Sequence, residues 1–171
     1  MRQWRRRDAE ARPEPRRVVI VGGGFAGLFA ARAFRRRPVH VTLVDRAAHH
    51  LFQPLLYQLA TGLLETTAVG HSLRDLVKDQ DNATIHKAPV TAIDLDARKV
   101  RFDGLAPIAY DYLVFALGAQ VNFFGTEGAA EHAFPMYTLR DAVKLKDHVL
   151  ERWEAADKES ALVDDGALTV V

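Results

Sequence analysis

The chain has 171 residues, of which 49% are hydrophobic and 26% charged, a balance that suits one globular domain with a core. The net charge of +1 gives no reason to expect a nucleic-acid partner, and the absence of cysteine excludes disulfides and a redox relay through a cysteine pair. Residues 1–17 carry seven arginines against three acidic residues and show no apolar periodicity. We therefore expect a disordered basic tail over 1–16.

The first structured unit is a predicted strand, turn, helix and second strand. Residues 17–21 form a short apolar run, as expected of a strand that is buried on both faces. Apolar residues recur at helical spacing over 25–34, and Pro38 blocks any continuation of this helix. Residues 40–44 form a second strand that ends in Asp45. The unit has the size of one βαβ crossover.

A glycine fingerprint joins the first strand to the helix. Gly22 permits a tight turn, Gly24 lets the backbone approach a pyrophosphate, and Gly27 lets the helix pack closely on the strand. A strand precedes these glycines, a helix follows them, and an acid stands 18 residues after Gly27. This context predicts dinucleotide binding at the helix N-terminus. The alternative is a glycine-rich turn that binds no ligand.

The acid at the end of the second strand is predicted to bind the adenosine ribose. Asp45 can accept hydrogen bonds from the ribose hydroxyls, and its charge disfavours a 2′-phosphate. The neighbouring Arg46 weakens this argument, because an arginine can accept a 2′-phosphate. The alternative for Asp45 is a solvated carboxylate at a strand end.

The middle of the chain is predicted to hold a small β insertion. Pro54 prevents the apolar stretch over 50–62 from forming one helix, and a capping box at Ser72 begins a short helix that runs to Lys78. Three β-like runs predict an antiparallel meander over about 83–110. Such an insertion is the arrangement of two-dinucleotide flavoproteins, which favours FAD over a nicotinamide.

The remainder returns to the main sheet. Residues 111–117 form a buried strand that ends at Gly118, and a capping box at Thr138 begins a helix that runs to about Ala156. Residues 168–171 begin another apolar strand. We therefore predict an α/β fold in which a mostly parallel sheet carries helices on both faces and a small antiparallel meander is inserted.

Several strings of the sequence resemble a known family. The segments RVVIVGGGFAGLFAARAF, VTLVDRAAHHLFQPLLYQLATGLL, VTAIDLDARKV and YDYLVFALGAQVNFFG are similar to the N-terminal part of type II NADH:quinone dehydrogenases. The similarity covers roughly residues 16–171, and HLFQPLLYQLATG is its most distinctive piece. The domain prediction is a Rossmann-like FAD-binding domain over 17–160 and the start of an NADH-binding domain over 161–171.

The resemblance implies a respiratory flavoenzyme that passes electrons from NADH through FAD to a membrane quinone without pumping protons. It implies a cytoplasmic chain whose full-length enzyme lies on the cytoplasmic face of the inner membrane. Peripheral membrane association is implied only for a C-terminal part outside this sequence. A homodimer is left open.

The resemblance also implies contacts for the matching positions. The glycine loop would surround the FAD pyrophosphate, Asp45 and Arg46 would meet the ribose, and the Val90 backbone would meet the adenine. The cofactor-binding residues expected on this basis are Gly22, Gly23, Gly24, Phe25, Ala26, Gly27, Asp45, Arg46, Gln53, Val90, Ala116, Leu117 and Gly118. No catalytic side chain is assigned, because the flavin carries the reaction. No metal site is expected, because the adjacent His49 and His50 rarely share one tetrahedral ion.

The sequence holds one glycine fingerprint, and no second one for NADH. We therefore expect a truncated product or a domain fragment that is inactive alone. The alternatives are a catalytically inactive dinucleotide-binding remnant and another FAD-dependent pyridine-nucleotide oxidoreductase, such as a ferredoxin or sulfide reductase. Sulfide oxidation needs cysteines, and this sequence has none.

Overall fold

The computed structural model describes residues 14–170. The predicted basic tail over 1–16 therefore lies almost wholly outside the described residues, as does Val171. Arg16, which was assigned to the tail, is the first residue of strand β1 (Arg16–Val21). Among the described residues, no helix is both long and apolar enough to cross a bilayer.

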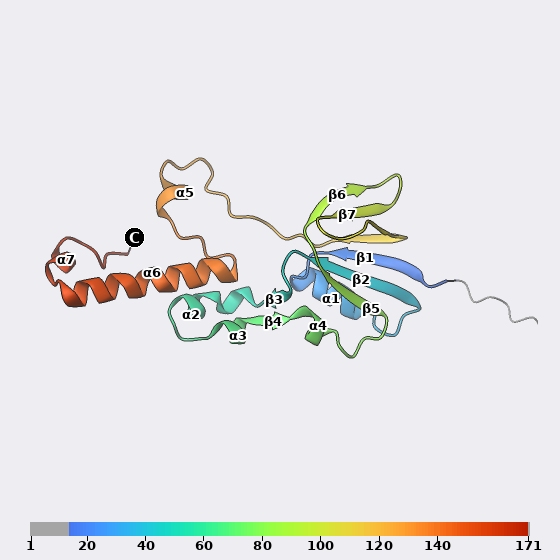
Figure 1. Cartoon of the computed structure of the whole chain (residues 1–171), viewed down its shortest axis with the longest axis horizontal. Helices are drawn as coiled ribbons and strands as arrows, with labels where there is room; N and C mark the ends of the chain where they lie inside the picture. Colours follow the sequence, from blue (N-terminus) through green and yellow to red (C-terminus); the bar gives the residue numbers. More distant parts are fainter. Residues whose placement is uncertain (1–13, 171) are drawn as a thin grey trace, which may run out of the picture.

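A four-stranded parallel sheet forms the centre of the fold (Figure 1). Its order is β5-β2-β1-β9, where β1 pairs with β2 (Val39–Asp45) on one side and with β9 (Tyr112–Phe115) on the other. Strand β5 (Ala83–Lys87) pairs with β2 at the far edge. The strands predicted over 17–21 and 111–117 thus lie in one sheet, which confirms the α/β fold.

Helix α1 (Phe25–Ala33) covers one face of this sheet. The helix begins directly after the glycine loop and ends before Pro38, as predicted. Alternate residues of β1 and β2 point toward it and form a buried cluster together with Leu73. This cluster consists of Val18, Ile20, Ala31, Val41, Leu43 and Leu73.

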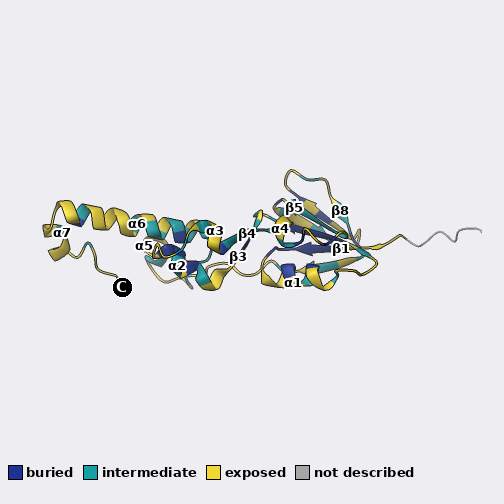
Figure 2. Ribbon diagram, turned by 90° about the horizontal axis from the view of Figure 1, so that it is seen from below, coloured by how far each residue is buried: buried dark blue, intermediate teal, exposed yellow. Residues whose placement is uncertain are grey.

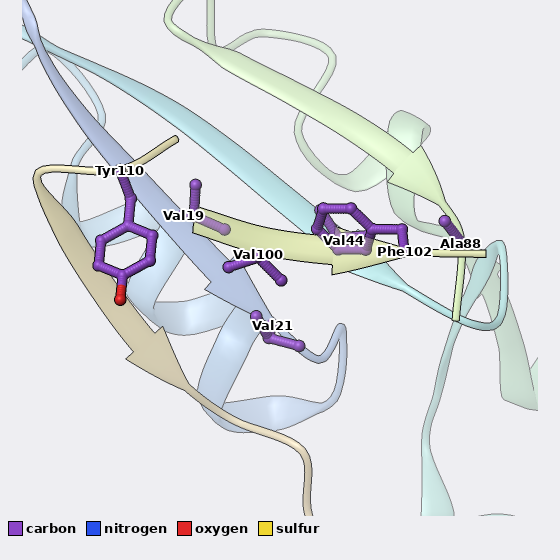
Figure 3. Packing of buried hydrophobic residues seen from close by; sticks show 7 residues of the cluster. All are labelled: Val19, Val21, Val44, Ala88, Val100, Phe102 and Tyr110. Atoms are coloured by element: carbon purple, nitrogen blue, oxygen red, sulfur yellow. The ribbon is translucent and has the colours of Figure 1, made fainter. Parts of the chain in front are cut away.

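An antiparallel meander covers the opposite face, where helices were also predicted. It consists of β6 (Val90–Asp94), β7 (Lys99–Phe102) and β8 (Ile108–Ala109). Its inward side chains meet those of the sheet in a second cluster, drawn in Figure 3: Val19, Val21, Val44, Ala88, Val100, Phe102 and Tyr110. The prediction of helices on both faces is therefore wrong, because the meander already buries this face.

The start of the meander also differs from the prediction. Residues 83–87 were assigned to it, but they form β5, which pairs with β2 in parallel. Pro89 follows β5 and has no N–H to offer a neighbouring strand, so the chain leaves the sheet there. The meander accordingly begins at Val90.

The segment between β2 and β5 breaks into short elements, as expected from Pro54. It runs through β3 (His49–Leu51), a 3-10 turn (Gln53–Leu55), α2 (Leu56–Ala60), α3 (Thr66–Val69), β4 (Gly70–Ser72) and α4 (Leu73–Leu76). Strands β3 and β4 pair antiparallel. The Ser72 side chain accepts from the Asp75 N–H at 3.4 Å and so begins α4, which ends before the predicted Lys78.

The longest helix lies beyond the sheet. The predicted capping box is present: Thr138 and Asp141 bond reciprocally and begin α6 (Leu139–Lys158). Helix α6 packs against α2 at the end of the molecule away from the sheet, as Figures 1 and 2 both show. Two single-turn helices flank it, α5 (Ala129–His132) and α7 (Ala161–Asp164).

The predicted strand at the end of the chain is absent from its described part. Residues 168–170 form a turn followed by irregular chain. A strand is stable only when an adjacent strand completes its hydrogen bonds, and no described strand lies beside this segment.

One side chain ties β9 to β1, and its titration should show in the stability of the sheet. The Asp111 carboxylate accepts a hydrogen bond from the Arg17 backbone N–H at 2.7 Å and lies 3.4 Å from the Arg17 guanidinium. These hydrogen bonds hold the pKa of Asp111 below its usual value of 3.8. A lowered pKa stabilises the fold above pH 3.8, and this stabilisation is lost as the pH falls through the folded-state value.

We therefore expect Asp111→Asn to lower the Tm slightly at pH 7, because the contact is solvent-screened. The difference from the native chain should shrink as the pH falls below 3.8. Thermal unfolding, monitored by circular dichroism between pH 2.5 and pH 7, measures the Tm difference and its dependence on pH. An equal Tm difference at every pH would contradict the assigned role of the charge.

Candidate functional site

The cleft of the domain opens at the carboxyl ends of the parallel strands. Its volume is about 670 Å³, and the loops after β1, β2 and β9 form most of its wall. This edge of an open α/β sheet is where such folds bind ligands. The lining residues are Gly23, Gly24, Phe25, Ala26, Asp45, Arg46, Ala47, His49, Leu51, Gln53, Phe115, Ala116, Leu117, Gly118, Tyr137, Thr138 and Leu139.

Two glycines of the fingerprint are required by the protein itself. Gly22 has φ +106°, a left-handed value that other residues rarely adopt. A Cβ on Gly22 would overlap the carbonyl oxygen of Ala116, and a Cβ on Gly27 would overlap the carbonyl oxygen of Gly22. These residues therefore allow β1, α1 and the end of β9 to come together.

Gly24 has no such structural reason. Its φ of −69° is open to any residue, and no atom lies within 4 Å of the position that a Cβ would take. That position faces the cleft, because Gly24 is part of its lining. A glycine is needed there only if a ligand approaches the backbone, so the cleft fits the pyrophosphate of a dinucleotide.

The N-terminus of α1 is free to bind an anion. No side chain caps it, no acid stands in its first turn, and the N–H groups of residues 24–27 donate to no other described residue. Helix α6 also begins at the cleft, but its own capping box occupies the N–H groups of Thr138 and Asp141 and places a carboxylate in the first turn. Because its first N–H groups are free and no acid lies in its first turn, α1 suits a phosphate better than α6 does, and phosphate binding there stays a prediction.

Asp45 joins the glycine loop to the loop that follows β2. One carboxylate oxygen accepts from the Gly23 N–H at 2.5 Å, and the other accepts from the Ala47 N–H at 2.6 Å. Each oxygen keeps a second acceptor site that could meet a ribose hydroxyl. Asp45 and Arg46 both line the cleft, so the structure allows the ribose role, which stays a prediction.

The opposite wall is held by Tyr137. Its hydroxyl accepts from the Ala119 N–H at 3.0 Å, and its carbonyl oxygen accepts from the Gln53 side chain at 3.0 Å. Gln53 and the Ala116–Gly118 loop therefore lie on one cleft as expected, although contact with the flavin remains a prediction. Sequence patterns gave no signal for Tyr137, because its partners lie 18 and 84 residues away.

Val90 is the one expected residue whose surroundings differ from the rest. Val90 does not line the cleft. Gly22 and Gly27 do not line it either, but they support the glycine loop, which forms part of the cleft wall. Val90 begins β6 two residues after Ala88, whose N–H bonds the carbonyl oxygen of Asp45 at 2.9 Å. Its backbone contact with the adenine stays a prediction.

His50 is a polar residue of the site that sequence reasoning considered only as a metal ligand. It is buried, with 5% of its surface exposed, and its Nδ1 lies 3.0 Å from the carbonyl oxygen of Gly23. The described residues contain no group of three or more His, Asp or Glu side chains that could hold a metal. His50 thus bonds the glycine loop, and its neighbour His49 lines the cleft.

These features together define a dinucleotide-binding α/β domain: a parallel sheet, a glycine loop with one glycine facing the cleft, an uncapped helix N-terminus, and a carboxylate at a strand end. The pyridine nucleotide-disulphide oxidoreductase family matches residues 16–163, and the chain belongs to this family. The family is FAD-dependent, which confirms the class of cofactor expected from the sequence.

Curated relatives agree with the resemblance seen in the sequence. The chain is 42% identical over 144 residues to a type II NADH:quinone oxidoreductase, NdhA, of Mycobacterium tuberculosis, covering 82% of this chain and 31% of that protein. It is 35% identical over 160 residues to the demethylphylloquinone reductase NdbB of Synechocystis, covering 88% and 38%. The chain spans about a third of the length of the curated relatives that it matches.

Solved structures share the fold. NDH2 from Plasmodium falciparum in complex with NADH superposes with a TM-score of 0.76 at 23% identity, covering 83% of this chain and 30% of that one. The sulfide:quinone oxidoreductase of Aquifex aeolicus superposes with a TM-score of 0.73 at 28% identity, covering 81% and 32%. The Rossmann-like FAD-binding fold is thereby confirmed.

The different surroundings of Gly24 and Gly27 make a matched test. Gly24→Ala should leave the Tm unchanged and weaken FAD binding by about tenfold or more, because its methyl group enters the cleft. Gly27→Ala should lower the Tm, because its methyl group meets the Gly22 backbone. Calorimetric titration and thermal unfolding measure the two effects. Unchanged FAD affinity in Gly24→Ala would contradict the assigned pyrophosphate position.

Proposed function

We propose that this chain supplies the FAD-binding part of an NADH:quinone oxidoreductase, in which electrons pass from NADH through FAD to a membrane quinone. The observation that carries the proposal is Gly24, where the fold leaves open space for a side chain beside the uncapped N-terminus of α1, as a pyrophosphate site requires. The names of the curated relatives support the rest.

Each part of the cleft has a proposed task. The N–H groups of residues 24–27 bind the pyrophosphate, and Asp45 binds the adenosine ribose. Gln53 and the 116–118 loop face the flavin side. Bound FAD supplies the redox chemistry, and the residues of this chain bind and orient it. No side chain of the cleft needs to act as an acid, base or nucleophile.

NADH and quinone are proposed as substrates of the longer protein. Relatives named for NADH and quinone are about three times as long as the matched region, and the one glycine fingerprint of this sequence is assigned to FAD. The proposed location of the longer protein is the cytoplasmic face of the inner membrane, where a peripheral enzyme would bind its quinone. A homodimer is compatible with this arrangement.

A sulfide:quinone reaction is the second candidate, because a solved enzyme of that activity shares the fold. The cysteine-free sequence disfavours it, since this chain offers no thiol for such chemistry.

Nucleotide preference tests the proposed role of Asp45. The native chain should bind ADP more tightly than its 2′-phosphorylated analogue, and FAD more tightly than NADPH, because a carboxylate repels a 2′-phosphate. Asp45→Asn should weaken ADP binding by about tenfold and narrow this preference, since a charge and one of its acceptor sites are lost.

Calorimetry with ADP, its 2′-phosphate, FAD and NADPH measures the preference, and the Tm of the variant controls for loosening of the glycine loop. Tighter binding of NADPH than of FAD by the native chain would refute the assignment.

A further inference from the structure

We propose that His50 is a positioning residue for the cofactor pyrophosphate: it holds the Gly23 carbonyl inside the protein and thereby turns the Gly24 N–H toward the cleft. This inference rests on the proposed binding of FAD. Sequence patterns did not indicate it, because the two residues that the bond joins are 27 positions apart.

The geometry fixes the state of the His50 ring. Its Nδ1 lies 3.0 Å from the Gly23 carbonyl oxygen, and a carbonyl oxygen can only accept, so Nδ1 carries a proton. Pairing of β3 with β4 places His50 opposite His71, and the Phe25 ring meets the His50 ring edge-on at 4.8 Å. The imidazole is therefore held by the Gly23 carbonyl and by the Phe25 ring.

The peptide between Gly23 and Gly24 transmits this contact. No described peptide bond is cis, and in a trans peptide the C=O and the N–H point in opposite directions. Because His50 is buried and Gly24 lines the cleft, a carbonyl that points to His50 leaves the Gly24 N–H pointing toward the ligand space. That N–H donates to no other described residue.

A second side chain, that of Asp45, binds the backbone N–H of Gly23. Asp45 accepts from the Gly23 N–H, so both polar groups of Gly23 are bound by side chains from outside the loop. Three consecutive glycines would otherwise allow this backbone many conformations, and ordering them on binding would cost affinity. His50 thus preorganises the loop before the pyrophosphate arrives.

The test uses two substitutions at position 50 and one control. His50→Phe keeps an aromatic ring beside Phe25 and removes the donor. His50→Asn places an amide donor near the position of Nδ1 and should restore the bond. His71→Phe makes the same exchange at the facing, exposed residue of β4, which has no bond to the loop.

ADP and adenosine are the probes, because only ADP carries the phosphates that the Gly24 N–H would meet. We expect His50→Phe to weaken ADP binding by about tenfold and to leave adenosine binding unchanged. His50→Asn should recover most of the ADP affinity, and His71→Phe should bind both probes as the native chain does. Calorimetry measures ADP, and NMR titration measures the weaker adenosine.

Equal losses for ADP and adenosine in His50→Phe, or unchanged ADP binding, would overturn the positioning role while leaving FAD binding by the native chain intact. Failure of the native chain to bind either FAD or ADP would instead refute the proposed function, and the positioning role with it.

If His50→Phe does not fold, NMR of the native chain still tests the positioning role of His50. Nitrogen-15 NMR of the His50 ring at neutral pH should show a proton on Nδ1, and ADP should shift the Gly24 amide signal strongly. A ring without a proton on Nδ1 would overturn the inference.

Discussion

The site depends on the contact between the glycine loop and the end of β9. Gly22 touches the Ala116 backbone, and Gly27 touches the carbonyl of Gly22, so neither position has room for a side chain. These contacts set how closely α1 approaches β1 and β9. At this separation the loops after β1 and β9 line the same cleft.

The two long helices that begin at this cleft show how structural and functional needs differ. Helix α6 caps its N-terminus with Thr138 and Asp141, which stabilises the helix, and the Asp141 carboxylate disfavours an anion there. Helix α1 leaves its first N–H groups open. Unbonded N–H groups weaken a helix by themselves, and a phosphate group offsets that cost when it binds.

The glycine loop between β1 and α1 is ordered by residues from the neighbouring strands. Asp45 at the end of β2 and His50 in β3 bind the N–H and the carbonyl of the same glycine. Leu73 packs against that glycine from the sheet-facing side of α4 and belongs to the core under α1. Binding geometry and core packing are thus parts of one arrangement.

The sequence by itself determined the local features of this protein. The apolar run before Gly22, the helical spacing after it and the capping box at Thr138 act over a few residues, and the structure has all three. Tertiary structure alone decided the pairing of β5 with β2, the cover of the second sheet face, and the bond from His50 to Gly23. Each of these contacts joins segments that are far apart in the chain. The secondary-structure preference of a short segment cannot predict such a contact, because the outcome depends on which surface or hydrogen-bond partner the folded protein places beside that segment.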